Sequence, residues 1–259
     1  MARNISLTIE YDGTRFCGWQ RQHRRGSSQG RRKVKDRRLK TIQEEIEKAG
    51  TRLFKKRIRL IGAGRTDSGV HAEAQIANLK IDTNLPLINI KRGLNSYLPG
   101  DIVILSAEDV ASHFHARFDA KEKLYRYAIL NRKERSPLLK RHTAFVSYDL
   151  DIDAMKKAAR RLVGKKDFKS FQASDKKEKN SVRTIKKLYI VERRPVVEIY
   201  IQADGFLYNM VRNIVGTLID VGRGRMQAQA IRDILSRRYR PAAGQTAPAK
   251  GLCLLKVFY

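Results

Sequence analysis

Segments with the period of β-strands follow one another at short spacing in both halves of this chain. Residues 5–11 alternate apolar and polar side chains, as a half-buried strand does. Residues 182–192 and 196–203 are two further strand-like runs that are separated by three residues, which predicts a hairpin. Helical apolar stripes, such as the one at 207–218, fall between such runs. Because few links are long enough for parallel crossovers, the pattern predicts an α+β fold with a mixed, mainly antiparallel sheet.

The length of 259 residues bears on the number of domains. It is about twice the common domain size, so we expect either one large domain or two intimately packed ones. A strand candidate at 102–105 ends the first series of elements, and a similar mixture of strands and helices begins after it. We therefore predict an N-terminal α+β domain at 1–108 and a C-terminal α+β domain at 109–259.

The chain carries a large excess of positive charge. It has 55 Lys and Arg against 26 Asp and Glu, which gives a formal net charge of +29. Such an excess repels itself unless it meets a polyanion. Nucleic acid is the expected partner, an anionic membrane surface is the second candidate, and a merely solubilising surface is the third interpretation.

Part of this charge is concentrated in one segment. Residues 21–40 contain ten Lys and Arg and one Asp, a net charge of +9. Glycine and serine within the run predict a mobile basic loop, which we treat as an insertion at 23–40. The loop is either a contact for nucleic acid or a solvated insertion without a role. Its glycines make it a poor amphipathic helix, so a membrane partner is not expected.

The patterns of cysteine, histidine and apolar residues narrow the possible chemistry. Cys17 and Cys253 are the two cysteines, too few for a disulfide framework or a multi-cysteine metal site. The five histidines have no ligand cluster beside them, and no phosphate-loop pattern occurs, so we expect no metal and no cofactor. The start shows no secretion-signal pattern, and no run of about 18 apolar residues appears. We therefore expect a soluble protein of the cytoplasm.

The most unusual segment is residues 62–72, which gathers Arg65, Asp67 and His71 among three glycines. Glycines allow a backbone to turn sharply and to approach another molecule closely. One interpretation is a loop with a reactive or metal-binding Asp67. The other is a turn in which Arg65 and Asp67 form a structural ion pair. No other nucleophile motif is recognisable, so Asp67 is the best candidate for a nucleophile or base.

The segment GRTDSGVHA at 64–72 resembles the active-site signature of the TruA family of tRNA pseudouridine synthases. The resemblance extends in the same order over nearly the whole chain. The other similar blocks are 11–13, 18–22, 41–43, 94–102, 114–118, 125–127, 167–171, 210–216 and 247–252. Two departures are visible: the basic run at 23–40 is longer than the usual link, and Ser68 stands where many members have Ala.

This resemblance implies a function, a fold and an assembly. The family isomerises uridine to pseudouridine in the anticodon stem-loop of tRNA, at positions 38, 39 and/or 40. The reaction is redox-neutral and needs no cofactor. The implied fold is two similar α+β halves joined across a central basic cleft, in a homodimer. The alternative is a non-catalytic basic RNA-binding protein, which would also account for the excess of positive charge.

The resemblance also assigns roles to four residues. Asp67 is the implied nucleophile, which attacks C1′ of the ribose or C6 of the base, or removes a sugar proton. Arg212 is its implied counter-ion, because a lone carboxylate in a dried pocket is neutralised by desolvation. Tyr125 stacks on the target uracil. Arg65 contacts the RNA and fills the space that the extruded base leaves.

Overall fold

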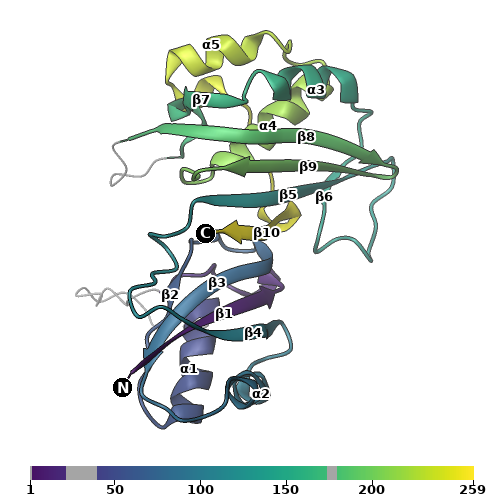
Figure 1. The fold of residues 1–259 in the computed structure, drawn as a ribbon. Coiled ribbons are helices and arrows are strands. Elements are labelled where there is room, and N and C mark those ends of the chain that lie inside the picture. Colours follow the sequence, from purple (N-terminus) through teal and green to yellow (C-terminus); the bar gives the residue numbers. More distant parts are fainter. Residues whose placement is uncertain (1, 22–39, 174–179) are drawn as a thin grey trace, which may run out of the picture. The chain divides into compact units, whose positions relative to one another are not determined.

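The computed structural model describes residues 2–21, 40–173 and 180–259 (Figure 1). The predicted basic insertion at 23–40 lies outside these residues, except for Lys40. The chain forms two compact units, Met1–Asp119 and Ala120–Tyr259. The first unit thus extends past the boundary predicted at 108. Asn4 ties this extension to β1 (Arg3–Tyr11), because its amide donates to the carbonyl oxygens of Ala111 and Phe114 at 2.9 Å each.

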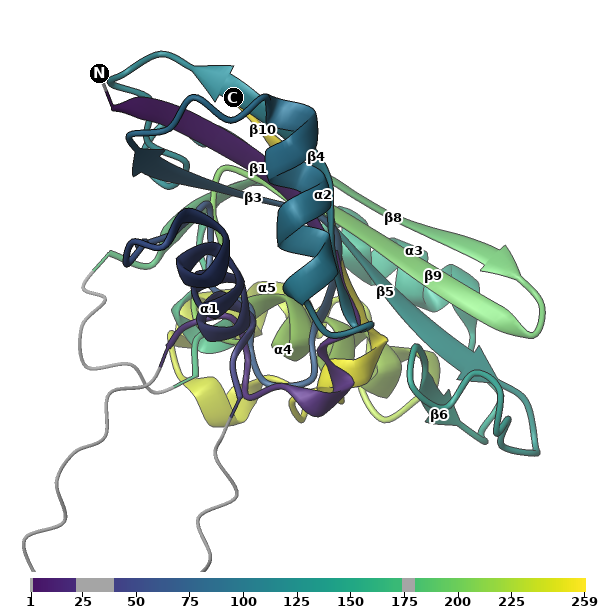
Figure 2. The same ribbon diagram turned by 90° about the horizontal axis from the view of Figure 1, so that it is seen from below.

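The first unit is an antiparallel sheet with β1 at its centre. The strands β3 (His71–Ile81) and β4 (Ile102–Val110) pair with its two edges, and the short β2 (Ile61–Gly62) pairs with β3. The predicted alternation of β1 is confirmed, since its apolar side chains are buried and its polar ones are mostly not. Two helices, α1 (Ile42–Phe54) and α2 (Leu87–Tyr97), lie side by side (Figure 2).

The start of α1 follows from its first residues. The side chain of Thr41 accepts a hydrogen bond from the amide of Glu44 at 3.3 Å, which satisfies one of the unpaired donors of the first turn. Ile42 and Ile46 are fully buried on one face. The helix therefore begins where Thr41 can cap it.

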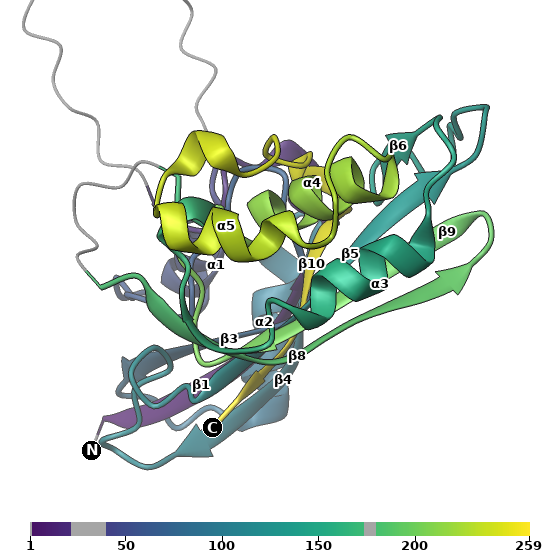
Figure 3. The same ribbon diagram turned by 90° about the horizontal axis from the view of Figure 1, so that it is seen from above.

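The second unit is a larger, mostly antiparallel sheet. Its strand order is β10–β5–β9–β8–β7, and β6 pairs with β5 in parallel. Three helices accompany it, and α3 packs against both β8 and α4 (Figure 3). The bounds are β5 Glu122–Asn131, β6 Ala144–Val146, α3 Ile152–Arg160, β7 Gly164–Asp167, β8 Val182–Arg193, β9 Val196–Ala203, α4 Met210–Gly222, α5 Ala230–Arg237 and β10 Leu252–Phe258.

The described residues therefore form five α-helices and mainly antiparallel sheets, which confirms the α+β class. The hairpin of β8 and β9 is also confirmed. Residues 57–61 alternate in the manner of a strand, but only Ile61 of this segment pairs with a neighbour. Ile58 and Leu60 are nevertheless buried, so their apolar character reflects packing rather than strand pairing. No helix in the described ranges is long and apolar enough to cross a membrane.

Candidate active site

The GRTD loop, residues 63–70, connects β2 to β3 in the first unit. The amide of Val70 donates to the carbonyl oxygen of Asp67 at 3.2 Å, and Gly69 has a φ of 78°. A positive φ at the third position is the mark of a type II turn, which favours glycine there. Asp67 is the first residue of this turn and is half-buried, so its position is fixed by backbone geometry.

The opening block of the chain holds the loop in place. The amide of Trp19 donates to the carbonyl oxygen of Thr66 at 3.1 Å. The carbonyl oxygen of Phe16 accepts from the amide of Gly69 at 3.3 Å and from the hydroxyl of Ser68 at 3.1 Å. The backbone on both sides of Asp67 is therefore bonded to residues 16–19.

Two glycines permit this close approach. Gly18 has a φ of 84°, and a Cβ added to it would lie 2.6 Å from the carbonyl oxygen of Thr66. A Cβ on Gly13 would lie 2.0 Å from the carbonyl oxygen of Val70. Neither distance is compatible with a side chain, so both positions require glycine. This explains physically why two glycines of the opening block accompany the GRTD loop.

Buried polar side chains tie the loop to the strands beneath it. The hydroxyls of Tyr11 and Thr66 are 2.8 Å apart, and Nδ1 of the buried His71 accepts from the amide of Gly13 at 3.1 Å. Sequence reasoning gave His71 no role. The only sequence signal for a role of His71 was its position within the segment 64–72. The structure shows that His71 anchors the Asp12–Gly13 turn.

Gln75 is a second residue near the loop that sequence reasoning missed. Its side chain is fully buried on β3, and its Nε2 donates to the carbonyl oxygen of Gly64 at 3.0 Å. Its Oε1 has no hydrogen-bond partner among the described residues. By contrast, Arg65 is exposed, and its side chain makes no hydrogen bond or ion pair within the described part of the chain.

Tyr125 lies on β5 in the second unit, between β10 and β9. It pairs with Leu254 on one side and Ile201 on the other, and only 7% of it is exposed. The ring of Phe206 meets its ring edge-on, with centroids 5.1 Å apart. Tyr127, two residues further along the strand, is also buried, so the two rings lie on one aromatic face of β5.

Tyr127 connects this face to the end of the chain. Its hydroxyl donates to the carbonyl oxygen of Pro248 at 2.8 Å. Burial raises the pKa of the Tyr127 hydroxyl well above its ordinary value, and the positive charge of Arg212 offsets this only in part. Arg212 donates to the carbonyl oxygen of Ala247, the residue before Pro248, and so lies near this end of the aromatic face.

Arg212 is half-buried in the first turn of α4. Its Nε donates to the carbonyl oxygen of Ala247 at 2.8 Å, and its Nη1 donates to the side-chain oxygen of Asn209 at 3.1 Å. The amide of Ala247 donates in turn to the carbonyl oxygen of Arg212 at 3.1 Å. Because a guanidinium is planar, these two side-chain bonds fix its orientation.

The segment that carries Ala247 lies directly on α4. A Cβ on Gly216 would be 1.6 Å from the carbonyl oxygen of Gln245, so only glycine allows the contact. The hydroxyl of Thr217 accepts from the amide of Gly244 at 2.9 Å. The glycine in the block at 210–216 thus serves to bring the Ala247 carbonyl to Arg212.

The structure places the four predicted site residues in pairs. Arg65 and Asp67 lie on one loop of the first unit, and Tyr125 and Arg212 lie in the second unit. Within residues 2–21, 40–173 and 180–259, no group of three or more His, Cys, Asp or Glu is arranged to hold a metal ion.

Comparisons with known proteins give consistent results. The profile of a family described as tRNA pseudouridine synthase matches residues 7–119 and 158–259. The chain is 46% identical over 257 residues to "tRNA pseudouridine synthase A 2" of Clostridium perfringens, covering 99% of this chain and 100% of that protein. It is 44% identical over 257 residues to "tRNA pseudouridine synthase A" of Thermoanaerobacter sp., with the same coverage.

Proposed function

Because the chain belongs to the tRNA pseudouridine synthase family, we propose that it is an isomerase that converts uridine to pseudouridine in the anticodon stem-loop of tRNA, at positions 38, 39 and/or 40. The reaction breaks the C1′–N1 bond, rotates the uracil and forms a bond between C1′ and C5. C5 then loses its proton and N1 gains one, so the overall change is an isomerisation without oxidation or reduction.

Asp67 is the proposed nucleophile. The observation that supports this role best is the clamp on the GRTD loop, which holds the backbone on both sides of Asp67 and leaves its side chain half-buried. A carboxylate held in this way is pre-positioned for attack on C1′ or C6, or for removal of a sugar proton. Such positioning requires no rearrangement of the loop when the nucleoside arrives.

Arg212 is the proposed counter-ion of Asp67. A guanidinium favours the ionised carboxylate in a site from which water is excluded. The bonds from Arg212 to Ala247 and Asn209 support this role, because they orient the guanidinium before substrate binds. The proposal requires the first and second units to bring Asp67 and Arg212 to one basic cleft.

Tyr125 and Arg65 are proposed to hold the RNA. The ring of Tyr125, backed by Phe206, is proposed to stack on the target uracil while the glycosidic bond is broken. The exposed Arg65, two residues before Asp67, is proposed to occupy the place of the extruded base and to contact phosphate.

We also propose that the protein is a cytoplasmic homodimer, and that both units of the chain contribute to the cleft. We further propose that residues 23–40 contribute to RNA binding. Sedimentation analysis of the purified chain tests the dimer. A monomer at micromolar concentration that retains full turnover would contradict it.

The experiment that tests the function measures release of tritium from tRNA labelled at C5 of uridine, with carbodiimide mapping of the product. The wild type should release tritium and modify one or more of positions 38–40. Asp67→Asn should release none while it still binds tRNA. Asp109→Asn, which removes an exposed carboxylate of the same unit, is the matched control and should be active. Binding of tRNA by the wild type without tritium release would instead favour the non-catalytic RNA-binding protein.

A further inference from the structure

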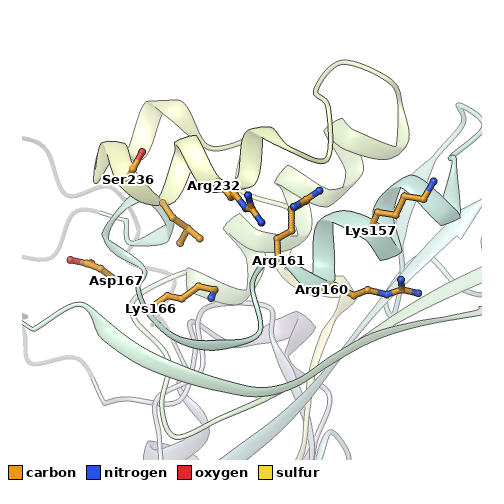
Figure 4. A pocket seen from close by; sticks show the side chains of 8 residues that line it. Lys157, Arg160, Arg161, Lys166, Asp167, Arg232 and Ser236 are labelled. Atoms are coloured by element: carbon orange, nitrogen blue, oxygen red, sulfur yellow. The ribbon is translucent and has the colours of Figure 1, made fainter.

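A basic pocket of about 770 Å³ lies within the second unit (Figure 4). It is built by the end of α3 and the residue after it, by β7, and by α5. None of its lining residues belongs to the GRTD loop, to β5 or to α4. The lining residues are Lys157, Arg160, Arg161, Lys166, Asp167, Arg232, Leu235 and Ser236.

Cations from three separate elements converge on this pocket. In Figure 4, Arg161 after α3, Lys166 on β7 and Arg232 on α5 lie around the same pocket. The negative end of a helix dipole can account for cations in the last turn of α3. It does not account for Lys166 and Arg232, which come from other elements. The convergence is therefore a property of the pocket rather than of one helix end.

Among the described residues, the cations of the pocket have no ion-pair partner. Within the described ranges, the side chains of the five Lys and Arg residues make no ion pair or hydrogen bond. Asp167 is the only acidic residue of the lining, and it is already engaged. It forms an ion pair with Nε of Arg238 at 3.0 Å and accepts a hydrogen bond from the hydroxyl of Ser181.

Arg161 adds a second observation. Its Nε is buried, yet it has no hydrogen-bond partner among the described residues. Buried donors in folded proteins are nearly always paired, so an unpaired one beside a pocket indicates a missing acceptor. An oxyanion in the pocket would supply that acceptor and would neutralise the converging cations at the same time.

The lining shows which oxyanion fits. Arginine forks and lysines suit phosphate groups. Among the described lining residues there is no aromatic ring on which a base could stack, and no carboxylate is available to read one, since Asp167 is paired with Arg238. Contacts to phosphate without contacts to bases are those that position a nucleic-acid backbone without reading its sequence.

We propose that this basic pocket binds the phosphodiester backbone of the tRNA substrate, as an anchoring site whose residues are distinct from the proposed catalytic ones. The identity of the RNA rests on the proposed function. The pocket contributes to substrate affinity and not to the chemical step, so its residues lower KM without changing kcat.

The test is the triple variant Arg160→Ala, Lys166→Ala, Arg232→Ala, compared with the wild type. None of the three side chains has a partner in the described structure, so the fold should be retained. The Kd for tRNA should rise about 10- to 100-fold at about 0.15 M salt. The negative slope of log Kobs against log salt should become shallower by about two to three. Tritium release at saturating tRNA should be unchanged.

A charge-matched control separates the pocket from the general charge. The triple variant Arg52→Ala, Lys56→Ala, Arg57→Ala removes three exposed cations from the first unit. Its Kd and salt slope should change much less than those of the pocket variant. Equal changes in the two variants would overturn the proposal. The double variant Arg160→Lys, Arg232→Lys keeps the charge and should retain most of the affinity.

Further measurements test whether the pocket instead binds free phosphate, a nucleotide or an anionic membrane. Calorimetry with inorganic phosphate and with ATP, and binding to phosphatidylserine vesicles, are compared between the wild type and the pocket variant. Loss of one of these in the variant, with tRNA affinity unchanged, would overturn the proposal. Failure of the proposed function has a different signature. The wild type would then release no tritium, while the effect of the pocket variant on RNA affinity would still decide whether the pocket binds RNA.

Discussion

The amide of Trp19 donates a hydrogen bond to the carbonyl oxygen of Thr66, at 3.1 Å, and so connects the opening block to the residue that precedes Asp67. The hydroxyl of Thr66 is also within 2.8 Å of the hydroxyl of Tyr11. The two contacts hold Thr66 through both its backbone and its side chain. Changes in the opening block should therefore act on Asp67 without touching it.

Gly18→Ala tests this clamp. The substitution forces Ala to a φ of 84° and puts its Cβ 2.6 Å from the Thr66 carbonyl oxygen. The positive φ alone should lower the free energy of unfolding by about 1–2 kcal/mol. If Asp67 is the nucleophile, a displacement of about 1 Å should lower kcat up to about 100-fold. Urea unfolding and tritium release measure the two effects.

Gly100→Ala is the control for that variant. A Cβ at Gly100 meets no atom within 4 Å, so stability and turnover should both be close to those of the wild type. Full activity of Gly18→Ala, with its loop unchanged, would show that the clamp does not position the catalytic residue.

Arg212→Ala should lower kcat about 10- to 150-fold, because hydrogen bonds to charged groups are worth about 1.5–3 kcal/mol. Arg212→Lys should recover little, since lysine cannot reproduce the two bonds to Ala247 and Asn209 that orient the guanidinium. Arg225→Ala, an exposed cation that follows α4, is the control. Single-turnover kinetics and tRNA affinity are measured together. A loss confined to affinity would argue against the role of counter-ion.

Tyr125→Leu removes the aromatic ring and keeps much of its bulk. Loss of base stacking, worth about 1–3 kcal/mol, should lower kcat/KM about 5- to 150-fold. Tyr125→Phe keeps the ring and should retain substrate affinity. Its kcat shows whether the hydroxyl assists removal of the C5 proton. Because only 7% of Tyr125 is exposed, a substitution there can disturb packing, and circular dichroism must show that both variants are folded.

The raised pKa of Tyr127 predicts that the free energy of unfolding falls at high pH. Its pKa is raised in the folded state by burial, whereas an unfolded tyrosine titrates near about 10. Below that pH both states keep the proton, and above it the unfolded state releases the proton first. The free energy of unfolding should therefore fall by about 1.4 kcal/mol per pH unit from this group as the pH rises above about 10.

The variant Tyr127→Phe isolates this contribution. Urea unfolding between about pH 9 and pH 11 should show a shallower decline than in the wild type. At neutral pH the variant should lose about 0.5–1.5 kcal/mol, since the hydrogen bond to Pro248 is removed. Tyr189→Phe, at an exposed position, should follow the wild-type curve. Parallel curves for the wild type and Tyr127→Phe would contradict the prediction.

Local signals made part of the fold predictable. Thr41 is the cap of α1, and the link between β8 and β9 is short, so both features could be derived from neighbouring residues. The end of α3 could not. The apolar stripe runs to Val163, but α3 ends at Arg160, and the amides of 161–163 donate to the carbonyls three residues back. Gly164 follows this turn and opens β7 with a φ of 99°.

The sequence predicts which residues belong to the candidate site, but it does not predict the contacts that arrange them in space. Asp67 stands out because Arg, Asp and His are gathered among glycines within residues 62–72, which a sequence shows directly. The clamp from residues 16–19 joins segments that are far apart in the chain, and nothing in either segment alone reveals the pairing. The same holds for Gly216, whose role depends on the carbonyl of Gln245. The roles of Asp67, Arg212, Tyr125 and Arg65 stay predictions.

The bond between Arg212 and Ala247 also has a consequence for protein synthesis. The arginine precedes its acceptor by 35 positions in the chain. A nascent polypeptide therefore exposes the guanidinium outside the ribosome before the carbonyl that orients it has emerged. Until the segment around Ala247 has been synthesised and has packed on α4, the bond to Asn209 is the only one of the two described orienting bonds that can form.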